Sequence, residues 1–296
     1  MSQNDPVTIT HKSGSSVTIY PYGAHITSFK TASGRELLFV SSSAKLDGSK
    51  AIRGGIPLVF PQFGQPDKSY PQHGFLRRNY WKAGLKEEGG DSSSCEFYLD
   101  LKDVETARGD GQWGKETKYD CRITLTVKIL AEELTTIMKF DNTGAVPFDF
   151  QTLFHTYLKV AGGKALDPTS CNVSGLEGYK AEDKITGEEY VLGESPIIID
   201  REVDRIYQNS SKPILSVVVN TGGQKVSLKA KASVDGKETP VSVVVWNPHI
   251  EKAKGMSDFT DEQYHDMVCV EPGVLYDVPS IENGKSAVFE QVITAL

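Results

Sequence analysis

Hydrophobic and polar residues alternate with a period of two along much of this chain. Such alternation is typical of half-buried antiparallel strands, because successive side chains of a strand point to opposite faces. β-branched and aromatic residues, which favour strands, dominate the alternating segments. The clearest predicted strands lie within residues 17–20, 95–101, 122–130 and 224–230. Amphipathic helical windows are short, and we expect helical turns only near residues 42–46 and 250–254.

Turn-forming residues separate these strands. Segments rich in Gly, Asn, Asp and Ser recur at residues 13–14, 32–34, 88–94, 141–144, 220–223 and 234–236. Many short strands at close spacing predict a β-sandwich or barrel. Neither a low-complexity linker nor a repeat of fixed period divides the chain. We therefore expect an all-β fold made of one domain, residues 1–296.

The most informative predicted strand is residues 148–160, with the sequence FDFQTLFHTYLKV. Its even positions form a mainly apolar face, and its odd positions form a mainly polar one. His155 lies on the polar face of a strand whose other face enters the core. This position suits a concave, ligand-facing sheet, and it suits an ordinary solvated face equally well.

Glu271 ends a short apolar run near the C-terminus, before Pro272 and Gly273. A carboxylate in such a place is costly unless it is paired or hydrogen-bonded. Burial there raises the pKa of a glutamate above its reference of about 4.3, which makes it a useful general base. The alternative is a glutamate at a strand end that simply reaches water before a turn.

Arginines occur in two glycine-bearing segments, residues 45–61 with Arg53 and residues 71–79 with Arg77 and Arg78. Glycine allows the backbone to approach a ligand closely, and arginine is well matched to bidentate phosphate recognition. Two arginines would balance the charge of a phosphate dianion. The alternative is two surface loops with solvated arginines.

Trp246 and Asp204 are candidate sugar contacts. A tryptophan face stacks on the C–H groups of a sugar, and a carboxylate accepts hydrogen bonds from its hydroxyls. Neither residue is specific evidence, because a tryptophan in a buried strand usually belongs to the core.

Composition narrows the function classes. The chain has 296 residues and a net charge of −7, so it lacks the global basic field typical of proteins that bind nucleic acid or anionic membranes. Its four cysteines are far apart and form no C-x-x-C pair, which predicts reduced, buried thiols. The N-terminal residues show no targeting pattern, and no apolar run approaches the length of a membrane span. We expect a cytoplasmic protein.

Common catalytic motifs are absent from the sequence. It contains no G-x-S-x-G, no G-x-x-x-x-G-K-[ST] and no H-E-x-x-H. The six histidines show no close metal-ligand spacing, and His249 and His265 lie in different segments. We therefore expect neither a metal nor another cofactor.

Taken together, these segments resemble the hexose-6-phosphate mutarotase branch of the aldose 1-epimerase superfamily. The resemblance runs in order from about residue 45 to about residue 273 and covers nearly the whole chain. It is carried by residues 45–50 (KLDGSK), 53–61 (RGGIPLVFP), 71–74 (PQHG) with Arg77, 154–157 (FHTY), Asp204 with 206–209 (IYQN), 244–248 (VVWNP), 255–256 (GM) with 258–259 (DF), and 271–273 (EPG).

The resemblance implies a β-supersandwich like that of galactose mutarotase, and an isomerase that interconverts the α and β anomers of glucose 6-phosphate. It implies that His155 is the general acid and Glu271 the general base. It also implies that Arg53 and Arg77 form a phosphate-binding pair. The further substrate contacts that it implies are Gln72, His73 and Asp204. The expected partner is a hexose 6-phosphate, with no nucleic acid or membrane, and the expected state is a monomer.

The segment around Arg77 departs from the family pattern. Leu76 replaces the usual small residue, and Arg78 stands where asparagine is more usual. The spacing from His73 favours Arg77 as the phosphate ligand, with Arg78 on the other face of a strand.

Two other functions remain open at this point. A glycoside hydrolase would use Glu271 and Asp204 as paired carboxylates. A non-catalytic sugar-phosphate-binding module would keep the arginines and lack the chemistry, although both His155 and Glu271 are present.

Overall fold

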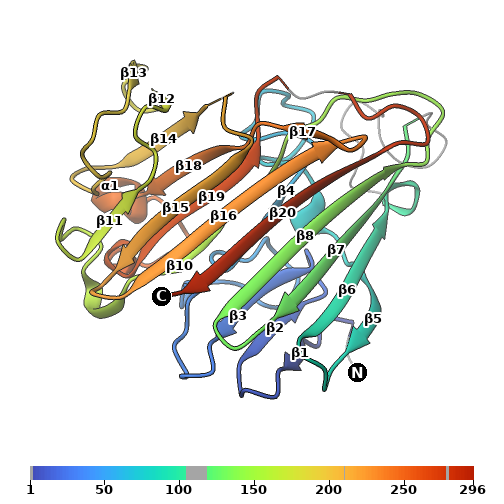
Figure 1. Cartoon of the computed structure of the whole chain (residues 1–296), viewed down its shortest axis with the longest axis horizontal. Helices are drawn as coiled ribbons and strands as arrows, with labels where there is room; N and C mark the ends of the chain where they lie inside the picture. The colour runs from blue at the N-terminus through green and yellow to red at the C-terminus, as the bar shows by residue number, and fades with distance from the viewer. Residues whose placement is uncertain (1–2, 105–118, 210, 278–279) are drawn as a thin grey trace.

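The computed structural model describes residues 3–104, 119–209, 211–277 and 280–296. In this part of the chain nearly all regular structure is β-strand, and every strand pair within the sheets is antiparallel. The described strands form a nine-stranded, an eight-stranded and a three-stranded sheet (Figure 1). The predicted all-β class is therefore confirmed.

The nine-stranded sheet faces the viewer in Figure 1. Its order is β11-β15-β16-β20-β8-β7-β6-β5, and β17 pairs with β16. The strands are β5 (Lys82–Glu87), β6 (Ser93–Asp100), β7 (Cys121–Ile129), β8 (Glu133–Asn142), β11 (Cys171–Ser174), β15 (Ile214–Thr221), β16 (Lys225–Val234), β17 (Lys237–Thr239) and β20 (Ser286–Ala295). Three of the predicted strands are confirmed as β6, β7 and β16.

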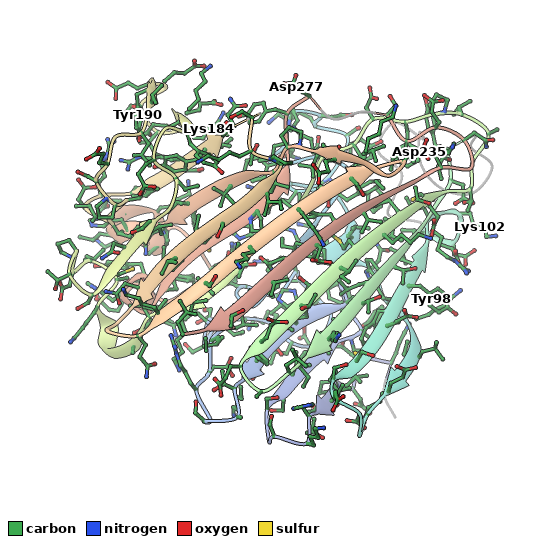
Figure 2. The ribbon with its side chains drawn as sticks, viewed as in Figure 1. Tyr98, Lys102, Lys184, Tyr190, Asp235 and Asp277 are labelled. Carbon is green, nitrogen blue, oxygen red and sulfur yellow. The ribbon has the colours of Figure 1, made fainter. Side chains whose placement is uncertain are left out.

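Alternation along β7 shows why these segments become strands. Ile123, Leu125 and Val127 are fully buried, whereas Arg122 and Lys128 on either side of this group are exposed. Burying each such aliphatic side chain stabilises the fold by roughly 1.5–3 kcal/mol. The outer face of this sheet meets solvent. Figure 2 shows the side chain of Tyr98, from β6, projecting away from the sheet at the right of the view.

The eight-stranded sheet lies behind the first and has the order β13-β12-β14-β18-β19-β9-β4, with β10 paired to β19 (Figure 1). The strands are β4 (Leu58–Val59), β9 (Thr152–Phe154), β10 (Tyr157–Lys159), β12 (Lys180–Asp183), β13 (Glu189–Val191), β14 (Val203–Gln208), β18 (Ser242–Asn247) and β19 (Met267–Val274). Every residue of β18 and of β19 is buried, so both faces of the sheet are covered at its centre.

The two faces of this sheet belong to different hydrophobic clusters. Val243 and Val245 of β18 join the large core, whose members come from both large sheets and from the small one. Val244 and Trp246, which point the opposite way, join a smaller cluster. The smaller cluster surrounds the candidate site described below.

The third sheet contains β1 (Val7–Thr10), β2 (Ser16–Tyr20) and β3 (His25–Lys30), and β2 confirms the remaining predicted strand. Short helices complete the described structure: α1 (His249–Lys254), η1 (Leu76–Arg78), η2 (Leu101–Asp103), η4 (Ala161–Gly163) and η5 (Gln263–Asp266). No helix among the described residues has the length and apolar character that crossing a membrane requires. All four cysteines are free and buried, as predicted.

One predicted helical turn is confirmed by α1, and the other is wrong. Residues 42–43 form a turn, and residues 44–46 have no regular structure. The side chain of Gln263 accepts hydrogen bonds from the hydroxyl of Ser41 and from the backbone N–H of Ser42. Serines that bond in this way draw the backbone away from helical hydrogen bonding.

Candidate active site

The predicted strand over residues 148–160 is interrupted at His155. It consists of β9 and β10, which both pair with β19: Leu153 lies opposite Gly273, and Tyr157 lies opposite Cys269. Between them, the backbone N–H of His155 bonds to the carbonyl of Pro57 instead of to β19. The continuous strand is therefore a wrong prediction. β9 and β10 nevertheless keep the same register against β19, which sets His155 across from Glu271.

The three central odd positions of this segment are not solvated. Leu153, His155 and Tyr157 are only 0%, 6% and 1% exposed. They share their face of the sheet with Val244 and Trp246 of β18, within the smaller hydrophobic cluster. The solvated-face interpretation of His155 is therefore wrong, and its side chain lies against a cavity.

Glu271 lies inside β19, which continues to Val274, and it is 1% exposed. The alternative that it reaches water before a Pro-Gly turn is wrong, because Pro272 and Gly273 are strand residues with β18 on one side. Burial raises the pKa of Glu271 well above its usual value, and the nearby charge of Asp204 adds to this effect.

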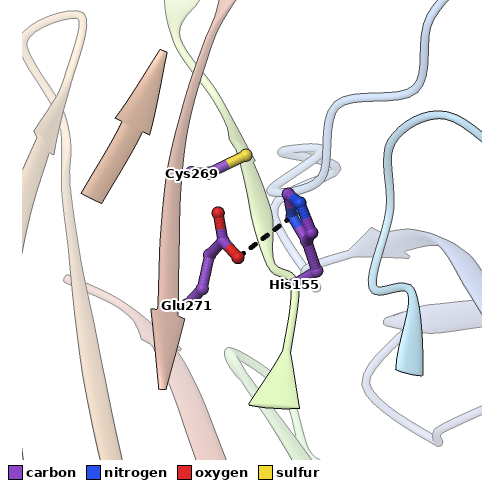
Figure 3. A group of neighbouring side chains, drawn as sticks. All are labelled: His155, Cys269 and Glu271. Carbon is purple, nitrogen blue, oxygen red and sulfur yellow. Dashed lines mark ion pairs between the residues drawn. The ribbon is translucent and has the colours of Figure 1, made fainter. Parts of the chain in front are cut away.

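His155 Nδ1 lies 3.4 Å from Glu271 Oε2 (Figure 3). Neither atom has a hydrogen-bond partner among the described residues. Burial lowers the pKa of His155 well below its usual value, and electrostatic interaction with His73, Arg77 and Arg53 lowers it further. The free site therefore favours the uncharged form of each group and leaves both able to exchange a proton with a ligand.

Aromatic neighbours hold the imidazole of His155 in place. The ring of Tyr157 stacks on it at 4.8 Å between centroids with an interplanar angle of 8°. The ring of Trp246 meets it edge-on at 6.0 Å, and the ring of His73 does so at 5.6 Å. These contacts restrict rotation of a ring that must keep its orientation during proton transfer.

The structure brings all eight residues named from the sequence to one cavity of about 320 Å³. They are Arg53, Gln72, His73, Arg77, His155, Asp204, Trp246 and Glu271. The remaining wall residues are Phe63, Gly64, Lys184, Val244, Lys252 and Met256. A volume of a few hundred Å³ with several converging polar groups is typical of a small-ligand site.

Arg53 is held at the cavity by two side chains. Asp258 accepts from Nε at 3.2 Å and from Nη2 at 3.3 Å, and the hydroxyl of Tyr157 accepts from Nη1 at 3.2 Å. Burial would lower the pKa of Arg53, but Tyr157 and Asp258 together raise it. The guanidinium is therefore a fixed positive charge with N–H donors remaining on its terminal nitrogens.

Arg77 is 8% exposed and lines the cavity, whereas Arg78 is exposed and does not. The strand expected here is wrong, because Leu76–Arg78 is the 3₁₀ helix η1, whose tight turn separates the two side chains. Arg77 Nη2 donates to the carbonyl of Gln72 at 2.8 Å, while Nε has no partner among the described residues. Burial, and then the charge of Arg53, lowers the pKa of Arg77 to about 10.

His73 presents a hydrogen-bond donor to the cavity. Its Nδ1 accepts the backbone N–H of Gly64 at 3.2 Å, which leaves the proton of the neutral ring on Nε2. Burial, and then the charges of Arg77 and Arg53, keep its pKa well below the usual value. The next residue must be glycine, because Gly74 has a φ of 72° and a Cβ there would collide with the carbonyl of Phe60.

Sequence reasoning did not assign four of the residues that shape this site. Tyr157 and Asp258 stand in segments that carry the family resemblance, but their contacts with Arg53 appear only in the folded chain. Lys184 and Lys252 lie in no recognisable motif, and each has a carboxylate partner, Glu182 and Glu202 respectively. Figure 2 shows Lys184 near one end of the eight-stranded sheet.

Comparisons with known proteins agree with this geometry. The family described as aldose 1-epimerase matches residues 5–294. A protein of Cenchrus ciliaris, provisionally named glucose-6-phosphate 1-epimerase, is 32% identical over 270 residues, which cover 90% of this chain and 77% of the relative. A protein of Escherichia coli K12 with the same provisional name is 29% identical over 273 residues, covering 92% of this chain and 84% of the relative.

Solved structures show the same fold. The crystal structure of a provisionally named mutarotase from Salmonella typhimurium matches with a TM-score of 0.79 at 22% identity, covering 100% of this chain and 92% of that one. A galactose mutarotase related enzyme from Lactobacillus acidophilus matches with a TM-score of 0.72 at 16% identity, covering 99% and 97%. The predicted galactose-mutarotase-like β-supersandwich is confirmed, and the chain belongs to the aldose 1-epimerase family.

Proposed function

We propose that this protein is an isomerase that interconverts the α and β anomers of glucose 6-phosphate, a hexose-6-phosphate mutarotase. The observation that carries the proposal is one cavity that holds both a buried His155–Glu271 pair and two arginines, Arg53 and Arg77. The pair supports proton transfer at a sugar ring, and the arginines support recognition of a phosphate ester. The names of the relatives from Cenchrus ciliaris and Escherichia coli support the same substrate.

The arginines are suited to a phosphate dianion. Arg77 is buried without a carboxylate partner among the described residues, so a bound anion would satisfy its open Nε. Arg53 is already oriented by Asp258 and Tyr157 and adds a second positive charge. Charge-assisted hydrogen bonds of this kind are roughly twice as strong as neutral ones. Sugar hydroxyls would then meet Asp204, Gln72 and the Nε2–H of His73, with Trp246 at the wall.

Ring opening requires two proton transfers. Glu271, as carboxylate, takes the proton from the anomeric O1–H, while protonated His155 gives a proton to the ring oxygen. The bond between C1 and the ring oxygen breaks, O1 becomes the aldehyde oxygen, and rotation about C1–C2 exposes the other face. Ring closure reverses both transfers and returns each proton to its starting group. The pair supplies the whole reaction, so we propose that no cofactor takes part.

The substrate itself favours the charged form of the acid. In the free site the positive charges of Arg77 and Arg53 contribute to the low pKa of His155. A phosphate dianion between these arginines offsets their charge and raises the proton affinity of His155. An unphosphorylated sugar lacks this effect, which gives a physical reason for a preference for the phosphate ester beyond binding alone.

The experiment that tests this function is magnetisation transfer by proton NMR on glucose 6-phosphate, with glucose alongside. We expect faster exchange between anomers for the phosphate ester only. Equal acceleration of both sugars would retain the His155–Glu271 chemistry and reject the arginine clamp. No acceleration of either would reject the proposal in favour of a binding module, and release of reducing sugar from a glycoside would favour a hydrolase.

We further propose a cytoplasmic, monomeric protein that works as one domain, without nucleic acid or membrane as partner. The four free, buried cysteines are typical of a reducing compartment. The net charge of −7 disfavours binding to polyanions. Size-exclusion chromatography with light scattering tests the oligomeric state, and a dimer mass would contradict it.

A further inference from the structure

Cys269 adds a thiol to the catalytic pair. Residues 269 and 271 are two positions apart on β19, so their side chains leave the same face of the strand. The ligand atoms of His155, Cys269 and Glu271 all lie within 4.8 Å of one another (Figure 3). Cys269 is fully buried, does not form part of the cavity wall and has no role in the proton transfers above.

We propose that His155, Cys269 and Glu271 form a binding site for a thiophilic divalent cation such as Zn²⁺, and that the bound cation inhibits the enzyme. The donor set of imidazole nitrogen, thiolate sulfur and carboxylate oxygen is the one that zinc uses in proteins. Mg²⁺ and Ca²⁺ prefer ligand sets made entirely of oxygen, so this site discriminates against them.

The geometry is close to what zinc requires. Zinc–ligand distances of about 2.0–2.3 Å place tetrahedral ligand atoms about 3.3–3.8 Å apart. The separation of 3.4 Å between His155 Nδ1 and Glu271 Oε2 already fits this range. The longest separation among the three ligand atoms is at most 4.8 Å, so it must shorten by no more than about 1–1.5 Å when the cation binds. His155 and Glu271 border the cavity, so water has access to the fourth position.

Two independent features favour a cation here. His155 Nδ1 and Glu271 Oε2 are buried without partners among the described residues, and a metal would satisfy both. The thiolate and the carboxylate carry two negative charges, which cancel the charge of a divalent cation and avoid an uncompensated buried charge. On binding, the thiol of Cys269 loses its proton to solvent through the cavity, and no redox step is involved.

Inhibition follows because the cation would occupy the atoms that move protons. This part of the inference rests on the proposed function, whereas the binding of the metal does not. The residue that separates the two is Cys269, since a change there removes a metal ligand and leaves both His155 and Glu271 in place.

Cobalt spectroscopy tests the binding without any assay of turnover. We expect Co²⁺ added to the intact protein to give a thiolate-to-cobalt charge-transfer band that saturates at one equivalent. The band should disappear in Cys269→Ser and in Glu271→Gln, and it should persist in Cys171→Ala, which removes another buried cysteine on β11. Absence of the band from the unmodified protein, or its persistence in Cys269→Ser, overturns the site. Cys269→Ala serves the same purpose where the serine variant fails to fold.

Zinc inhibition tests the consequence. We expect Zn²⁺ to stop anomer exchange, a chelator to restore it, and Mg²⁺ at the same concentration to have no effect. Cys269→Ser should weaken inhibition by Zn²⁺ at least about ten-fold. Loss of a residue that only hydrogen-bonds to a metal ligand already weakens metal binding by about this factor, and loss of a ligand itself should weaken it no less. Equal inhibition of both proteins overturns the inference. If the protein does not accelerate anomer exchange at all, the cobalt band still decides whether the metal site exists.

Discussion

Asp183 and Glu271 are both buried carboxylates on the eight-stranded sheet, with exposures of 2% and 1%. Asp183 Oδ2 accepts from Arg205 Nε and from Arg201 Nη2, each at 2.9 Å, and Oδ1 accepts the backbone N–H of Ile185 at 2.9 Å. Burial raises the pKa of Asp183, but the hydrogen bond from Arg205 and those from the backbone lower it overall. This carboxylate finds its partners within the chain and fixes the turn after β12.

Glu271 has the same burial and the opposite electrostatics. Its Oε2 has no hydrogen-bond partner among the described residues, and its pKa is raised by burial and by Asp204. Two arginines show the same contrast. Arg205 forms an ion pair with Asp183, whereas Arg77 has no carboxylate partner in the described structure. Burial alone therefore does not distinguish a structural ion pair from a reactive group. The distinction is whether the chain or a ligand completes the hydrogen bonds.

The largest expected effect is on turnover. Glu271→Gln should slow anomer exchange by about 10²–10⁴-fold, the usual contribution of a general base, while the protein stays folded. Asp183→Asn should change the rate per folded molecule only several-fold at most. Magnetisation transfer with glucose 6-phosphate measures both. A near-normal rate for Glu271→Gln would show that Glu271 is not the reactive carboxylate that distinguishes it from Asp183.

The next largest effect is on stability, where Asp183→Asn should cost more than Glu271→Gln. Asp183→Asn should lower the free energy of unfolding by roughly 3–5 kcal/mol, because it leaves a largely buried Arg205 without its counter-charge. Arg201, with a side chain 46% exposed, should contribute little to this loss. Glu271→Gln should not destabilise the fold, since it removes a carboxylate that lacks partners. Urea titration of the two variants checks the prediction, and equal losses would contradict it.

The arginines give a smaller effect, on substrate affinity. Arg77→Ala should raise the KM for glucose 6-phosphate about 10- to 100-fold, as expected for loss of charge-assisted hydrogen bonds of about 1.5–3 kcal/mol. Arg78→Ala is the matched control and should leave KM unchanged, because Arg78 does not line the cavity. Steady-state kinetics of the two variants distinguish them. An equal rise in both would show that general surface charge attracts the substrate.

Asp258→Asn sharpens the role assigned to Arg53. The neutral amide cannot hold the guanidinium in a two-point ion pair, so KM for the phosphate ester should rise by less than in Arg53→Ala. Kinetics of both variants with glucose 6-phosphate provide the measurement. A KM for Asp258→Asn that equals the unmodified value would show that Tyr157 alone suffices to orient Arg53.

The smallest expected effect is the dependence of stability on pH. The folded-state pKa of Glu271 is raised above its unfolded value of about 4.3, so the folded state holds more protons between the two values. Stability therefore falls as pH rises through that window, by at most about 1.4 kcal/mol per pH unit from this group. Glu271→Gln should remove this decline. The lowered pKa of Asp183 acts in the opposite sense, because its contribution is lost as pH falls through the folded value. Urea titrations at several pH values compare the slopes.

The alternating pattern predicted strands correctly where one face of a sheet meets solvent, as in β6, β7 and β16. It was misleading where both faces are covered. Around His155 the polar positions of the pattern are buried against a cavity, so polarity no longer reports solvent. The break between β9 and β10 also has no local signal, because it depends on the carbonyl of Pro57 from another segment.

The sequence by itself determined the strands β2, β6, β7 and β16 and, through the family motifs, the residue types at the cavity, including Arg53, His155 and Glu271. These follow from local periodicity and from short segments whose order is preserved along the chain. Only the tertiary structure decided which groups are satisfied. Asp258 reaches Arg53 across 205 residues, and Cys269 lies beside His155 because β19 pairs with both β9 and β10. Burial and hydrogen-bond partners set the pKa values of the site, and both are properties of packed neighbours that no local pattern contains.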